Sequence, residues 1–144
     1  MPRILMTGAA GGIGTSLRKL LPPIYPDLLL SDLKAPADLG KNEKFKAADL
    51  ADAAQVEAIC EGVDGILHFG GYSVEGPWDE ILQSNIIGCY NLFEAARKVG
   101  RELMVEIIAG KNGTLDRFTI ARAMQELYDL GIKPDWWKLE PQAD

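Results

Sequence analysis

Short apolar runs alternate with helical patterns along the chain. Runs that end at glycine or turn residues are typical of buried parallel strands, and they occur at residues 3–7, 28–32, 45–49 and 65–69. The first helical pattern begins at about Gly12 and ends at Pro22. Its predicted buried face consists of Ile13, Leu17, Leu20 and Leu21.

Helix-start and helix-stop signals support the same alternation. Asp52 and Gln55 form a capping-box pattern before a helix that ends near Gly62. A long helix is expected from about residue 77 to 99. A fifth strand at 103–108, a helix capped by Thr114 and a sixth strand at 135–139 follow. The expected buried face of that last helix is Ile120, Ala123, Met124, Leu127 and Leu130.

The alternation predicts an α/β fold of Rossmann-like type. We expect a truncated, three-layer, doubly wound parallel sheet with strand order 3-2-1-4-5-6. All 144 residues are expected to form one domain, with residues 1–100 as its dinucleotide-binding part and residues 101–144 as an added βαβ segment.

A glycine-rich loop between the first strand and first helix predicts a dinucleotide site. Gly8 permits the tight turn, Gly11 permits close approach of a pyrophosphate, and Gly14 lets the helix pack against the sheet. Asp32 follows Gly14 by 18 residues and ends the second strand. A carboxylate there accepts hydrogen bonds from ribose hydroxyls and repels a 2′-phosphate, which favours NAD over NADP. The alternative is a structural turn beside an ordinary surface aspartate.

Composition and charge narrow the function classes. The net charge of −6 argues against nucleic acid or an anionic membrane surface as a partner. No run approaches the roughly 18 apolar residues of a membrane span, and no signal peptide is expected. Cys60 and Cys89 are expected to be reduced thiols of a cytoplasmic protein, without a disulfide or metal site.

Several further motifs resemble one family. The glycine pattern of residues 7–14 is similar to that of the extended short-chain dehydrogenases. The segments Ala48–Leu50, Gly65–Gly71, Ser73–Pro77 and Asn85–Ala96 resemble uronate dehydrogenase specifically. The resemblance covers residues 3 to about 100. It implies an NAD-dependent oxidation of galacturonate and glucuronate to aldaric acid lactones.

The resemblance also implies roles for matching residues. Asp49 and Leu50 would flank the adenine, or alternatively form the approach to a helix cap. Asn85 would occupy the family's helix asparagine position, or be an ordinary polar helix residue. His68 is expected to be packed and hydrogen-bonded rather than catalytic. The full expected cofactor set is Gly8, Gly11, Gly12, Ile13, Gly14, Asp32, Leu33, Asp49, Leu50, Gly70, Gly71 and Asn85, with Ser73 as a vestigial substrate contact.

No catalytic residue is expected, because the resemblance ends near Gly100. Uronate dehydrogenases continue with a serine-rich strand and a Tyr with a Lys four positions later, where the Lys lowers the pKa of the Tyr general base. Here the only later tyrosine is Tyr128, and Ile132 stands four positions on.

Residues 101–144 resemble a different protein, the aldolase-like (β/α)8-barrel domain fused to sugar kinases of inositol catabolism. The segment Gly131–Pro141, with its paired tryptophans, carries this resemblance. Lys138 could be a Schiff-base lysine, but a charge that blunts a strand edge is favoured. Two resemblances that meet near residue 100 predict an engineered chimera, monomeric rather than a family dimer, that binds NAD weakly. The alternatives are a dehydrogenase with residual activity and a scaffold without a ligand.

Overall fold

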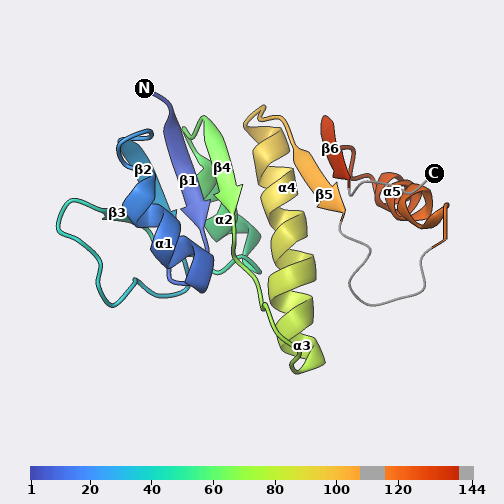
Figure 1. Cartoon of the computed structure of the whole chain (residues 1–144), viewed down its shortest axis with the longest axis horizontal. Coiled ribbons are helices and arrows are strands. Elements are labelled where there is room, and N and C mark those ends of the chain that lie inside the picture. The colour runs from blue at the N-terminus through green and yellow to red at the C-terminus, as the bar shows by residue number, and fades with distance from the viewer. Residues whose placement is uncertain (108–115, 140–144) are drawn as a thin grey trace. The chain divides into compact units, whose positions relative to one another are not determined.

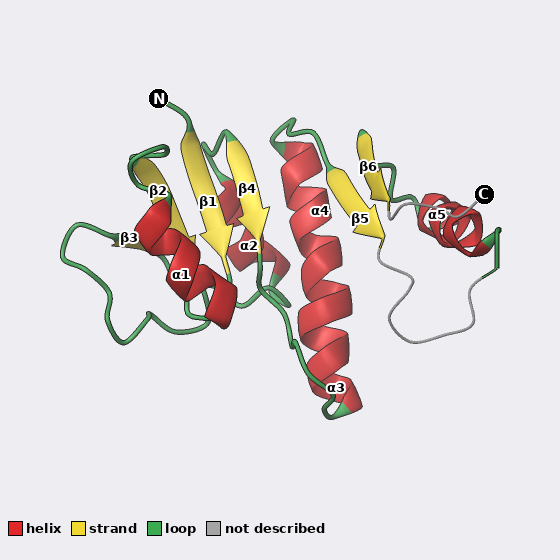
Figure 2. Ribbon diagram, viewed as in Figure 1, coloured by secondary structure: helices red, strands yellow, loops and turns green. Residues whose placement is uncertain are grey.

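The computed structural model describes residues 1–107 and 116–139. Contacts between residues divide the chain into two compact units, Met1–Arg101 and Glu102–Asp144, and each is described by itself. The expectation of one domain over the whole chain stays a prediction. The Thr114 cap lies outside the described residues. Figures 1 and 2 show the elements of both units.

Unit 1 is a parallel sheet with helices on both faces, which is a Rossmann-like arrangement (Figure 2). Its strand order is β3-β2-β1-β4, as the sequence predicted for these strands. The strands are β1 (Arg3–Thr7), β2 (Asp27–Ser31), β3 (Lys44–Phe45) and β4 (Gly65–His68). The helices are α1 (Gly12–Leu20), α2 (Ala53–Cys60), α3 (Trp78–Ile81), the π-helical η1 (Leu82–Ile87) and α4 (Gly88–Lys98).

Alternate residues of the central strands supply two separate cores, because successive side chains point to opposite faces of a sheet. Leu5 and Leu29 belong to the core that contains residues of α2 and α4. Ile4 and Met6 belong to the core beneath α1. β1 and β2 are apolar on both faces, as parallel strands between two helical layers must be.

The buried face of α1 differs from the predicted one. Leu17 and Leu21 pack against the core, but Ile13 is 62% exposed and Leu20 is 67% exposed. The buried positions of α1 are Gly14 and Arg18. Helical spacing did not reveal this, because it counts an arginine as polar. The Arg18 guanidinium is buried because Glu43 and Asp38 neutralise it.

Unit 2 contains β5 (Met104–Ile107), α5 (Thr119–Asp129) and β6 (Trp136–Leu139). β5 and β6 pair in parallel and form a two-stranded sheet of their own. The expected pairing of strands five and six is therefore confirmed, but the expected pairing of strand five with strand four is not found among the described residues. Along β5 exposed and partly buried residues alternate, whereas a strand inside a doubly wound sheet is buried on both faces.

The observed buried face of α5 agrees in part with the face that the sequence predicted. Ile120 is buried, Ala123, Met124 and Leu127 are partly buried, and Leu130 is 71% exposed. Lys138 pairs with Glu106 across the two strands at 2.9 Å, which agrees with a role at the strand surface. In the described residues, no helix is both long and apolar enough to cross a membrane.

Candidate functional site

The glycine loop joins β1 to α1 by a turn that two of its glycines make possible. Gly8 has a φ of +70°, and a Cβ there would lie 2.4 Å from the carbonyl carbon of Phe69. A Cβ on Gly14 would lie 2.1 Å from the Gly8 carbonyl oxygen. No side chain fits in either place. Gly8 has the turn role that the sequence predicted, whereas the close approach at Gly14 is to the glycine loop rather than to a strand.

The N-terminus of α1 is open to an anion. Gly11 occupies the cap position without a side-chain hydrogen bond, and the first turn carries no acidic residue. Gly12 faces open space, since a Cβ there would meet nothing within 4 Å. The first N–H groups of a helix have no partner within the helix, and they carry its positive end. Gly12 and Ile13 therefore present backbone N–H groups to whatever approaches this end, whereas the Gly11 N–H donates to the Gly8 carbonyl at 3.0 Å.

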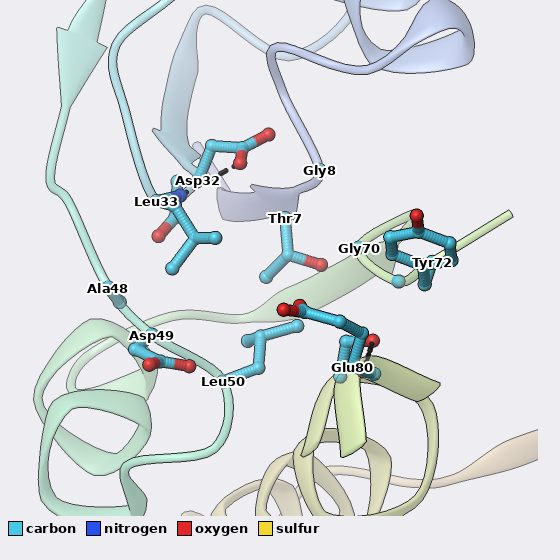
Figure 3. A pocket seen from close by; sticks show the side chains of 13 residues that line it. Thr7, Gly8, Asp32, Leu33, Ala48, Asp49, Leu50, Gly70, Tyr72 and Glu80 are labelled. Carbon is cyan, nitrogen blue, oxygen red and sulfur yellow. Dashed lines mark hydrogen bonds between the residues drawn. The ribbon is translucent and has the colours of Figure 1, made fainter. Parts of the chain in front are cut away.

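Asp32 lies directly after β2 and holds the glycine loop. Its Oδ2 accepts a hydrogen bond from the backbone N–H of Ala10 at 2.9 Å. Its Oδ1 accepts one from the N–H of Leu33 at 2.8 Å, drawn in Figure 3. Each carboxylate oxygen keeps a further lone pair for another donor. The side chain can thus shape the loop and bind a hydroxyl at the same time.

A cavity of about 170 Å³ opens beside this loop, where β1, β2 and β4 end (Figure 3). Among the expected cofactor residues, those that line it are Gly8, Asp32, Leu33, Asp49, Leu50, Gly70 and Gly71. Ligands of open α/β sheets bind at this kind of place, at the carboxyl ends of the strands. Gly11, Gly12, Ile13, Gly14, Ser73 and Asn85 do not line this cavity.

Asp49 and Leu50 line the cavity and also form the approach to α2, and their contact with an adenine stays a prediction. Asp49 Oδ1 accepts a hydrogen bond from the N–H of Ala51 at 2.9 Å, so it shapes the turn before α2. The Leu50 carbonyl accepts one from Asn91 at 2.9 Å. A Cβ on Gly70 would lie 2.7 Å from Leu50 Cδ1, so a glycine is needed for this close approach.

Asn85 clamps the loop after β4. Its Oδ1 accepts a hydrogen bond from the Tyr72 N–H at 2.6 Å, and its Nδ2 donates one to the Tyr72 carbonyl at 2.9 Å. A Cβ on Gly71 would lie 2.9 Å from Asn85 Oδ1. Asn85 therefore positions the cavity wall at Tyr72, and direct contact with a cofactor stays a prediction for this residue.

His68 is packed and hydrogen-bonded beneath the cavity, as the sequence predicted. Its Nδ1 lies 2.7 Å from Thr7 Oγ1, and its Nε2 lies 3.4 Å from Cys89 Sγ. Burial lowers the pKa of His68, because the imidazolium is poorly solvated there. Cys60 and Cys89 are free thiols, and burial raises the pKa of Cys89 and that of Cys60 to about 11.

Sequence reasoning did not identify six residues that line the cavity: Thr7, Ser31, Ala48, Tyr72, Glu80 and Ser84. Thr7 and Ser31 are the last residues of β1 and β2, so the rule for strand ends could have found them. Tyr72, Glu80 and Ser84 carry no such signal, because they lie in the loop after β4, in α3 and in η1, and tertiary contacts bring them to the cavity.

The fold belongs to the Rossmann class, whose members bind dinucleotides at this edge of the sheet, and comparisons with known proteins specify the family. The model of the NAD dependent epimerase/dehydratase family matches residues 4–111, well over half of the chain, so the chain belongs to that family. A second family, described as an uncharacterized protein conserved in bacteria (DUF2090), matches residues 80–144.

Uronate dehydrogenases are among the similar proteins. That of Pseudomonas syringae pv. tomato is 52% identical over 100 residues, covering 68% of this chain and 36% of the relative. That of Agrobacterium fabrum is 49% identical over 135 residues, covering 94% of this chain and 49% of the relative. The chain thus spans less than half the length of these relatives.

Solved structures agree with this relationship. A crystal structure of a mutant uronate dehydrogenase from Agrobacterium tumefaciens complexed with NAD has a TM-score of 0.64 and 52% identity. The matched region is 68% of this chain and 37% of that protein. A glucuronic acid dehydrogenase from Chromohalobacter salexigens has a TM-score of 0.69 and 41% identity, with 83% and 46% coverage.

Proposed function

We propose that the chain binds NAD at this site, as the dinucleotide-binding part of a uronate-dehydrogenase-like protein. One observation carries the proposal: the Asp32 carboxylate lies against the glycine loop, beside the uncapped N-terminus of α1. Asp32 would accept hydrogen bonds from the adenosine ribose, and the N–H groups of Gly12 and Ile13 would meet the pyrophosphate. A related uronate dehydrogenase complexed with NAD supports the proposal.

We also propose that these 144 residues alone do not oxidise a uronate. The resemblance places the reaction's proton transfer on a Tyr with a Lys four residues later, and the sequence offers Tyr128 followed by Ile132. The Tyr128 hydroxyl instead accepts a hydrogen bond from the Trp137 indole at 2.9 Å. A positioned general base typically contributes about 10²–10⁴-fold to rate.

We propose that residues 101–144 have a different origin from residues 1–100. The proposal of a chimera with a barrel-type segment is based on the sequence resemblance alone. The second family match over residues 80–144 and the division of contacts after Arg101 mark the same part of the chain as different. The Agrobacterium fabrum relative favours another candidate, a shortened uronate dehydrogenase with residual activity, because its similarity extends over 94% of the chain.

Titration with NAD by calorimetry tests the binding proposal, and Gly12 offers a matched pair of variants. A Cβ at Gly12 would meet no atom within 4 Å, so the fold should tolerate Gly12→Glu and Gly12→Gln alike. The Glu variant places a negative charge where the pyrophosphate would lie. We expect it to bind NAD roughly tenfold more weakly than the Gln variant. Equal affinities would refute the placement, and no heat with the unmodified chain would refute NAD binding.

An assay of uronate oxidation distinguishes an inactive NAD-binding chain from a shortened dehydrogenase with residual activity. Galacturonate or glucuronate with NAD should produce no NADH above a protein-free blank. A reproducible, protein-dependent rise in absorbance that Gly12→Glu weakens more than Gly12→Gln would instead establish residual dehydrogenase activity.

A further inference from the structure

The polar groups around the cavity differ in whether they are already hydrogen-bonded within the protein. At the end of β2, each carboxylate oxygen of Asp32 accepts one backbone hydrogen bond and keeps a further lone pair. Gly12 and Ile13 begin α1, and no side chain caps their end of the helix. This part of the site, which we call the β2 side, therefore has unused acceptors and donors for a ligand.

The opposite wall, near the end of β4, is paired within the protein. Thr7 Oγ1 lies 2.7 Å from His68 Nδ1. The Tyr72 N–H donates to Asn85 Oδ1 at 2.6 Å, and the Tyr72 carbonyl accepts from Asn85 Nδ2 at 2.9 Å. Ser84 Oγ donates to a backbone carbonyl of α3 at 2.6 Å. Thr7, Tyr72 and Ser84 all line the cavity, so on this β4 side these hydroxyl and backbone groups are engaged before a ligand arrives.

The Glu80 carboxylate and the Tyr72 hydroxyl are further polar groups of the β4 side. Glu80 is an exposed residue and Tyr72 is 37% exposed, so water already solvates both. A hydrogen bond that only replaces one to water contributes little net free energy. The β4 side therefore offers a ligand a surface to lie against, and few groups that would recognise it.

The strand order determines which part of a dinucleotide would meet each side. In the order β3-β2-β1-β4, β1 separates β2 from β4, and Figure 3 shows Asp32 and Tyr72 on opposite sides of Thr7. With the adenosine ribose at Asp32 and the pyrophosphate at the start of α1, the second nucleotide would extend towards β4. The Gly70 backbone lies against Gly8, so it adjoins the diphosphate. The adenosine diphosphate would thus meet the unused groups, and the nicotinamide nucleotide the paired wall.

We propose that the site recognises the adenosine diphosphate part of its ligand, and that the nicotinamide adds little to the affinity. The ligand class is then the ADP-ribosyl compounds. NAD is one member, and ADP-ribose, which is NAD without its nicotinamide, is another. This inference rests on the nucleotide site of the proposed function, and it widens the range of ligands that the chain binds there.

Calorimetric titration with NADH and with ADP-ribose tests the inference. NADH is the matched dinucleotide because, like ADP-ribose, it lacks the positive charge of the oxidised nicotinamide ring. The unmodified chain should bind the two within about threefold of each other, since contacts with a paired and solvated wall give little net gain. Nicotinamide mononucleotide, which carries the other half of the dinucleotide alone, should give no saturable heat.

The two Gly12 variants check that ADP-ribose occupies the same site as NAD. The charge in Gly12→Glu acts on the diphosphate, which both ligands carry. ADP-ribose should therefore bind Gly12→Glu roughly tenfold more weakly than Gly12→Gln, the same factor as expected for NAD. Equal binding of ADP-ribose to the two variants would overturn the inference.

The pattern of binding also distinguishes the inference from the proposed function. A preference for NADH over ADP-ribose beyond the expected factor, or saturable binding of nicotinamide mononucleotide, would overturn the inference and leave the proposed function intact. Binding of ADP-ribose without any binding of NAD would support the inference and refute the proposed function. No binding of any of these ligands would overturn both.

Discussion

The Asp32 carboxylate and the backbone N–H of Ala10 are joined by a hydrogen bond of 2.9 Å across 22 residues of chain. This contact ties the end of β2 to the glycine loop that follows β1. The side chain that the proposed function assigns to the ribose therefore also fixes the loop beside the pyrophosphate. Its two roles can be separated by substitution.

We expect Asp32→Ala to weaken NAD binding and to erase most of the preference for NAD over NADP. The variant loses both the acceptor for Ala10 and the charge that repels a 2′-phosphate. Asp32→Asn keeps an acceptor oxygen and loses only the charge. It should lose the preference while retaining more NAD affinity, as calorimetry with both cofactors would reveal. Full preference in the Ala variant would contradict this assignment.

Asn85→Ala should loosen the wall at Tyr72, because two hydrogen bonds to the Tyr72 backbone are lost. We expect a loss of about 1–2 kcal/mol in the free energy of unfolding and faster hydrogen exchange at the Tyr72 amide. Asn85→Asp is the control, since it keeps the acceptor for the amide but cannot donate to the carbonyl. Its Tyr72 amide should stay better protected than in the Ala variant. Unchanged exchange in Asn85→Ala would rule out the clamp.

His68 should make stability depend on pH below its ordinary pKa of 6.5, because burial lowers its pKa in the folded state. Above 6.5 both states hold a neutral imidazole and the contribution is fully present. As the pH falls below 6.5, the unfolded chain binds the proton first, so the free energy of unfolding decreases. This decrease continues until the pH reaches the folded-state pKa.

Urea unfolding at about pH 7.5 and at about pH 5.5 measures this effect. His68 is the only histidine in the sequence, so His68→Gln should remove most of the stability difference between the two pH values. An equal difference in the variant would show that other groups cause it.

The buried Arg18 guanidinium should be more costly to leave unpaired than to remove. Arg18 is 2% exposed, and its Nη1 donates to both Glu43 carboxylate oxygens at 2.7 and 2.5 Å. Glu43→Gln leaves that charge with Asp38 alone and should cost about 2 kcal/mol in unfolding free energy. Arg18→Met replaces the charge by an apolar side chain and should cost less. A smaller loss for Glu43→Gln than for Arg18→Met in urea unfolding would contradict this explanation.

Sequence reasoning was most successful where local pattern and backbone geometry determine the result. The strand order through β4 and the role of Gly8 follow from strand runs and from the space a turn leaves. It was wrong where a side chain's surroundings decide, as at exposed Ile13. It was right that β5 pairs with β6 and wrong that β5 pairs with β4, because a run of four residues does not determine every neighbour of a strand.

The residues of the candidate site also fall into two groups, those that sequence spacing predicts and those that only tertiary contacts determine. Asp32 lies at a fixed distance from the glycine motif, so its position beside the loop could be predicted from spacing. Ser84 and Tyr72 reach the cavity through a π-helical segment and a clamped loop, and both depend on tertiary contacts. The hydrophobic periodicity of the sequence does not predict such contacts, so these residues can be identified only from the folded structure.

Parallel titration of the unmodified chain with NAD and NADP tests the central claim most directly. The carboxylate at Asp32 and the open N-terminus of α1 predict saturable binding of NAD and clearly weaker binding of NADP. Equal or tighter binding of NADP, or no binding of NAD, would contradict the account of this cavity as an NAD site.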